Sequence, residues 1–141
     1  MADLLLPVVK LFFPCEEATF DQDRLGLVLA VPFQAIAIPT NAAFPYECSS
    51  FVCYAMLSDA IGTFRFSVAV MYEESERVLT RTAGVTLTFG TAARFGTQDF
   101  AITIPVVRFP RPGVYSLQLM CNELPLENGA FALRVLGGTS L

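Results

Sequence analysis

The chain has 141 residues, the size of one ordinary domain, and its 9 lysines and arginines against 13 aspartates and glutamates give a formal charge of −4. With this acidic balance we expect no basic patch that would neutralise a row of phosphates, so nucleic acid is not an expected partner. Histidine is absent. Because histidine is the usual proton-transfer group near neutral pH and the commonest metal ligand, we predict no catalytic residue, no metal site and no cofactor.

The N-terminal residues carry an acid, Asp3, where a signal peptide carries basic residues, and Lys10 interrupts an apolar run too short to cross a bilayer. The sequence therefore predicts a cytoplasmic protein without a membrane span. Hydrophobic residues make up 54% of the chain and charged residues 16%, against about a quarter charged in soluble domains. Either another subunit or another part of this chain must cover the apolar surplus.

Two stretches, residues 25–38 and 51–57, are apolar on both faces of an expected strand, and Pro32 predicts a bulge or a jump between sheets. A sandwich strand needs only one buried face, so the second face requires a cover. We favour another subunit, and the alternative is that residues 4–13 fold over these faces. The expected interface residues are Leu27, Leu29, Val31, Phe33, Tyr46, Phe51, Tyr54 and Met56.

The clearest strand spans residues 64–72, where large apolar side chains alternate with Arg65, Ser67 and Ala69. The same period of two returns within residues 85–89, 100–106 and 115–121. Turn residues rich in glycine, proline, asparagine and acids separate these runs, at a spacing typical of antiparallel hairpins.

No stretch carries the 3.6-residue period of a crossover helix, which excludes a parallel α/β fold. The sequence predicts an all-β, antiparallel β-sandwich, immunoglobulin-like or related, with about eight to nine short strands. We expect a single domain over residues 1–136 and a short tail over 137–141. Four prolines lie inside or beside strands, where the missing N–H blunts edge pairing, so association is expected through faces more than edges; they are Pro7, Pro14, Pro105 and Pro110.

Several tracts together resemble a family of small bacterial β-sandwich proteins catalogued only as a domain of unknown function. They are Phe13-Pro-Cys-Glu-Glu, Arg24-Leu-Gly-Leu-Val-Leu, the proline-rich connection through Phe44-Pro45, Gly62-Thr-Phe-Arg-Phe-Ser-Val, and Phe109-Pro-Arg-Pro-Gly-Val-Tyr115 with Asn122-Glu-Leu. The resemblance covers most of the chain and implies a sandwich fold. It implies no activity and no functional residue.

The four cysteines show neither C-x-x-C pairing nor the dense spacing of a disulfide framework, so we expect them to be reduced and mostly buried. Cys121 alternates in phase with core residues, and Cys48 and Cys53 are expected on one strand with opposite parity; the fourth is Cys15. A cysteine nucleophile needs a nearby base or cation, and no histidine exists to act as the base.

Two acidic clusters offer a second hypothesis, a ligand- or calcium-binding module. They are Glu16, Glu17, Asp21 and Asp23, and Glu73, Glu74 and Glu76. A third hypothesis is a peptide modifier, because Leu133-Arg-Val-Leu-Gly137-Gly138 is similar to the tail of ubiquitin-like modifiers, although no central helix is predicted. The leading hypothesis is a non-catalytic scaffold or adaptor that forms a homo-oligomer or docks on a protein partner.

Overall fold

The computed structural model describes residues 6–21, 26–39, 41–75, 77–90 and 97–137, and for residues 18–30 no side chain is described. Within these residues the chain is all-β, with twelve strands in three sheets and no helix. The all-β prediction is therefore confirmed. The expected number of eight to nine strands was too low, because three of the strands have only three residues, too few for alternation to mark them in the sequence.

The four-stranded sheet has the order β2 (Gly26–Pro32), β1 (Val8–Asp21), β5 (Phe51–Ser58) and β9 (Thr97–Ile104). The six-stranded sheet has the order β3 (Ala35–Ala37), β12 (Leu124–Leu136), β11 (Gly113–Cys121), β6 (Gly62–Tyr72) and β7 (Arg77–Arg81), with β8 (Val85–Phe89) also paired to β6. A small sheet joins β4 (Tyr46–Cys48) to β10 (Val107–Phe109).

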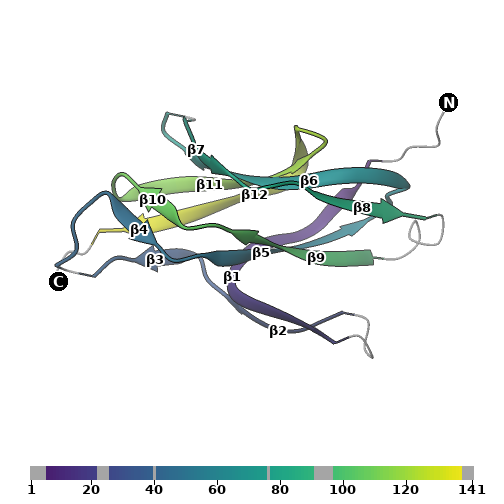
Figure 1. Ribbon diagram of the computed structural model, residues 1–141, viewed down its shortest axis with the longest axis horizontal. Helices are drawn as coiled ribbons and strands as arrows, with labels where there is room; N and C mark the ends of the chain where they lie inside the picture. Colours follow the sequence, from purple (N-terminus) through teal and green to yellow (C-terminus); the bar gives the residue numbers. More distant parts are fainter. Residues whose placement is uncertain (1–5, 22–25, 40, 76, 91–96, 138–141) are drawn as a thin grey trace.

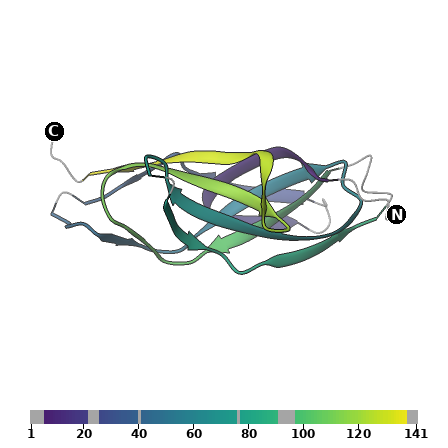
Figure 2. The same cartoon turned by 90° about the horizontal axis from the view of Figure 1, so that it is seen from above.

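The two larger sheets form two layers, with the six-stranded sheet above the four-stranded one in Figure 1 and overlapping it in Figure 2. Alternate residues of each central strand fill the space between them, as period-two patterning requires. Phe64, Phe66 and Val68 from β6 are buried there. The Phe66 ring lies 5.0 Å from the ring of Phe100 on β9, so the aromatic packing joins the two layers.

Pro32 ends β2 in the four-stranded sheet, and the chain then enters the six-stranded sheet as β3, parallel to β12. The predicted jump between sheets at Pro32 is therefore confirmed. Proline ends a strand here because it has no N–H to continue the ladder. The expected continuous strand over residues 100–106 is wrong, because β9 ends at Ile104, the side chain of Val106 is exposed, and β10 pairs with a different sheet.

The hairpin of β11 and β12 is irregular on its β12 side. Gln118 pairs with Ala130, and Met120 pairs with Pro125, so four residues of β12 bulge opposite one residue of β11. The Gln118 side-chain amide donates to the backbone carbonyls of Leu119, Leu126 and Gly129, at 2.9, 3.1 and 3.2 Å. This amide fixes the shape of the bulge.

Candidate interaction surface

The side of the four-stranded sheet that points away from the core carries the residues we call the outer face. Along β5, alternation sends Phe51, Cys53 and Leu57 into the core and leaves the intervening side chains on the opposite side. The strand registers place neighbours from β1 and β9 on the same side. The outer face comprises Val8, Leu11, Phe13, Cys15, Val52, Tyr54, Met56, Asp99, Ala101 and Thr103.

This outer face is largely apolar, as expected for residues 51–57, and part of it is open to solvent. Val8 and Leu11 on β1 are 41% and 47% exposed, and Met56, directly opposite Leu11, is half-buried. Large apolar side chains exposed on one side of a sheet form the kind of patch that marks interaction surfaces. Val31 on β2 is 42% exposed, but it follows the opposite parity to Pro32, which pairs with Cys15 of the outer face.

Tyr54 lies in the part of the outer face that is shielded from solvent, and its side chain is only 1% exposed. Its ring lies 5.2 Å from the ring of Phe13, and its hydroxyl donates to a carboxylate oxygen of Asp99 at 2.8 Å. Burial, together with this hydrogen bond and the charge of Asp99, raises the pKa of the Tyr54 hydroxyl. Tyr54 therefore stays neutral, with its hydroxyl hydrogen-bonded to Asp99.

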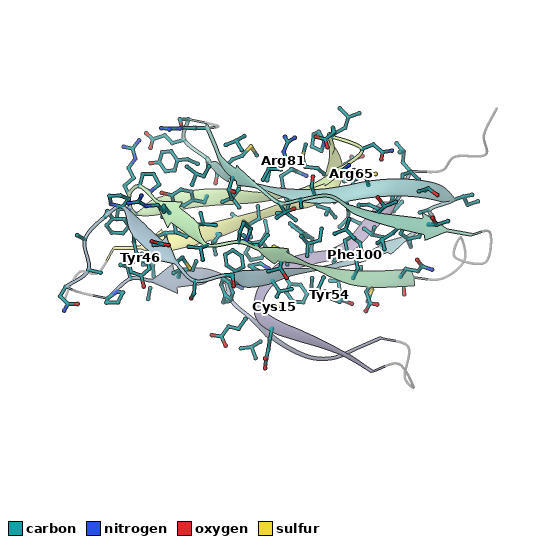
Figure 3. All side chains as sticks on the ribbon, in the orientation of Figure 1. Cys15, Tyr46, Tyr54, Arg65, Arg81 and Phe100 are labelled. Atoms are coloured by element: carbon teal, nitrogen blue, oxygen red, sulfur yellow. The ribbon has the colours of Figure 1, made fainter. Side chains whose placement is uncertain are left out.

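The hairpin of β1 and β2 curls beneath the outer face. It hangs below β5 and β9 in Figure 1, and β2 contacts β9 although these strands lie at opposite edges of the sheet. Figure 3 shows Tyr54 and Cys15 on the side of β5 that faces the hairpin. The alternative cover, residues 4–13, is wrong for the described part of that segment, because residues 8–13 form a strand beside β5. The second half of β1 and β2 provide the cover.

The predicted interface residues have different environments. The side chains of Leu27 and Leu29 lie outside the described residues, whereas Val31 is exposed. Phe51 and Tyr54 are buried within this chain, so neither side chain is accessible to a partner. Phe33 is half-buried against the Phe51 ring, with 5.3 Å between centroids. Met56 is half-buried on the outer face, and Tyr46 on β4 packs against the core at one end of the molecule (Figure 3).

Sequence patterns missed Val8 and Leu11, which are the most exposed apolar residues of the outer face. Both precede the stretches that read as apolar on both faces. A shift in the pairing register between Val9 and Leu11 breaks the alternation of β1, so no simple period of two marks these positions.

A groove of about 680 Å³ runs beside this surface. It is lined by Phe13, Pro32, Phe33, Gln34, Ala35 and Phe131. A second groove, of about 350 Å³, shares Phe33 and Ala35 with the first and is also lined by Glu16, Cys48 and Phe51. Both grooves have mixed walls, and neither brings together an ionisable pair suited to proton transfer among the residues that line it.

The four thiols are free, as the sequence predicted; three are buried and Cys48 is half-buried. Cys48 lies on β4 and Cys53 on β5, so the expectation that they share a strand is wrong; Ser49 and Ser50 separate the two strands. Burial raises the pKa of each thiol, which disfavours the reactive thiolate.

Within the described residues no three cysteine, aspartate or glutamate side chains gather in a way that could hold a metal ion. Glu16, Glu17, Glu73 and Glu74 are exposed, and Glu74 accepts a hydrogen bond from the Tyr72 hydroxyl at 2.7 Å. The side chains of Asp21, Asp23 and Glu76 lie outside the described residues. The calcium hypothesis stays a prediction.

The similarity to a modifier tail falls partly on a strand. Leu133 and Val135 are buried in β12, and Gly137 follows that strand. Gly138 lies outside the described residues, so the proposed processing after it stays a prediction. In the part of the chain that the structure describes, no helix is long and apolar enough to cross a membrane.

One solved structure that resembles part of this chain is the Pseudomonas fluorescens alkylpurine DNA glycosylase AlkC bound to DNA containing an abasic site analog. It is 13% identical, the match covers 74% of this chain and 28% of the AlkC chain, and the TM-score is 0.45. At this TM-score the likeness carries no argument about this chain. No curated protein matches the sequence. Residues 10–135 match the model of DUF6941, and the chain therefore belongs to this family of unknown function.

Proposed function

We propose that this chain is a cytoplasmic, non-catalytic scaffold or adaptor module that self-associates through the exposed part of the outer face. The observation that carries the proposal is the exposure of Val8 and Leu11 on the outer face of a sheet whose other side already packs in the core. The β1–β2 hairpin covers Tyr54 but leaves Leu11 almost half exposed. A second copy would remove this remaining apolar surface from water.

We further infer that the two layers are an immunoglobulin-like β-sandwich. The order β1-β5-β9 in one sheet and β12-β11-β6 in the other corresponds to the A-B-E and G-F-C orders of that fold. The Tyr115 hydroxyl donates to the backbone carbonyl of Arg111, four residues upstream, at 2.5 Å. This contact corresponds to the tyrosine corner found in such sandwiches.

The test is a pair of leucine substitutions followed by sedimentation velocity across micromolar concentrations. Leu11→Lys places a charge on the outer face and is expected to lower the assembly state or weaken association. Burying the exposed half of a leucine stabilises a complex by about 1 kcal/mol per copy, so association should weaken at least tenfold in a symmetric contact.

Leu124→Lys is the matched control, because Leu124 is 69% exposed and lies at the start of β12, in the six-stranded sheet. It should leave the assembly state unchanged. A wild-type chain that stays monomeric throughout the range, or equal effects of both substitutions, would remove the proposal.

A further inference from the structure

β9 forms one edge of the four-stranded sheet, and among the described strands it pairs only with β5. The pairing runs without a bulge from Thr97 opposite Ser58 to Ile104 opposite Phe51. An edge of this kind presents a row of N–H and C=O groups to any further strand.

Most of the other edges carry features that hinder strand addition; the exception is β8, which among the described strands pairs only with β6 and is five residues long. β2 contains Pro32 and pairs irregularly with β1, and β3 has only three residues. β7 carries Arg77 and Arg81, and β12 contains Pro125 and the bulge held by Gln118. Prolines, bulges, basic residues and short length are the usual protections of an edge.

β9 has none of these protections over its eight residues, Thr97-Gln-Asp-Phe-Ala-Ile-Thr-Ile104. Its single charge, Asp99, lies on the outer face and accepts the hydrogen bond from Tyr54. The prolines in the sequence had predicted association through sheet faces more than through strand edges. Pro105, however, lies after the end of β9 and leaves the strand itself unprotected.

Phe100 shows that the rim beside β9 is incompletely closed. Its side chain lies between the layers in Figure 3 and contacts the Phe66 ring, yet it is only half-buried. Ile102, two residues along the same face, is buried. An added strand with an apolar residue opposite Phe100 would complete this part of the core.

We propose that β9 is a strand-addition site whose partner is β9 of a second copy, antiparallel about a two-fold axis at Ala101. This register keeps the outer faces of both copies on one side, as the period of two requires. It places Phe100 opposite Ile102 of the second copy and Asp99 opposite Thr103 of the second copy. The ladder ends where Thr97 meets the proline that follows β9.

The chemistry of these pairs favours a second copy as the occupant. The aromatic and β-branched pair on the core side is a favourable cross-strand combination, and the threonine hydroxyl can donate to the carboxylate. The two Asp99 residues lie four positions apart along the ladder, so no like charges face each other. The contact is isologous, because each copy supplies the same surface.

This edge is a surface separate from Leu11 on β1, and the two surfaces can be tested independently. If both operate, the chain forms assemblies larger than a dimer. The edge is therefore tested in the Leu11→Lys background, where the outer-face contact is weakened and the edge contact should leave a dimer.

Thr103 is exposed on the outer face, so its substitution should not disturb the fold. Thr103→Glu would place one carboxylate opposite each Asp99 of the dimer, at two symmetric positions, and should raise the dimer dissociation constant roughly tenfold or more. Thr103→Lys should leave the dissociation constant equal or lower, because each lysine would face Asp99 of the second copy. Circular dichroism and thermal melting would confirm that both variants are folded.

The two substitutions at one position have opposite charge, so their comparison separates this register from a general effect of mutation. A Leu11→Lys chain that is monomeric at all concentrations would overturn the edge proposal, and so would equal dimer affinities for the Glu and Lys variants. If Leu11→Lys and the wild type have the same assembly state, the outer-face proposal fails. The dimer affinities of Thr103→Glu and Thr103→Lys still test the edge proposal in that case.

Discussion

The side-chain amide of Gln118 offers a direct test of how the bulge in β12 is held. Gln118→Met keeps the length and approximate volume of the side chain but removes its two N–H donors. These donors serve three carbonyls, those of Leu119, Leu126 and Gly129. Two neutral hydrogen bonds contribute about 2 kcal/mol in total, at roughly 1 kcal/mol each.

The assay is thermal and urea unfolding of Gln118→Met beside Gln34→Met, since Gln34 is an exposed glutamine in the connection between β2 and β3 and lies outside β9. We expect the first variant to lose about 2 kcal/mol, a fall of roughly 5 °C in Tm for a chain of this size. The second should stay within about 0.5 kcal/mol of wild type. Equal losses in the two variants would refute the role given to Gln118.

A charge at the same position sharpens the test. Gln118→Glu would place an acceptor-only carboxylate against three carbonyl oxygens, so it should destabilise the chain more than Gln118→Met at neutral pH. The pKa of the introduced carboxyl would be raised in the folded state. The excess destabilisation should therefore shrink as the pH falls through that raised pKa and the carboxyl becomes protonated.

Two further predictions concern single functional groups. Tyr115→Phe removes the hydroxyl that donates to the Arg111 carbonyl but keeps the ring, and it should lower the free energy of unfolding in urea by about 1 to 2 kcal/mol. Tyr72→Phe loses only a hydrogen bond to the exposed Glu74 and should lower it by less than about 0.5 kcal/mol. The reverse order of the two losses would contradict the proposed tyrosine corner. When the folded chain is treated with a thiol reagent, Cys48 should react slowly, and its rate should rise about tenfold for each pH unit while the pH stays below its raised pKa. The three buried thiols should react only when the chain unfolds. A second label that appears early in mass spectrometry would count against this prediction.

Local patterning in the sequence was sufficient to predict the all-β class and the central strands. The alternation over residues 64–72 and 115–121 corresponds to β6 and β11, whose apolar members fill the space between the layers. Pro32 marked the change of sheet. These features follow from the stereochemistry of proline and from the alternation of side chains along a strand, and each of the two can be recognised in the local sequence.

Alternation could not determine which apolar face is covered by the chain itself. Residues 51–57 are apolar on both sides, and the structure alone places Phe51 in the core and Tyr54 on the side of β5 that the β1–β2 hairpin covers. That cover depends on irregular registers in β1, which curl the sheet until β2 reaches β9. Register shifts and curl arise from pairing between distant segments, and so does the position of β9 at an unprotected edge. Tertiary structure therefore decided where exposed apolar surface remains, because burial depends on long-range contacts that no local pattern encodes.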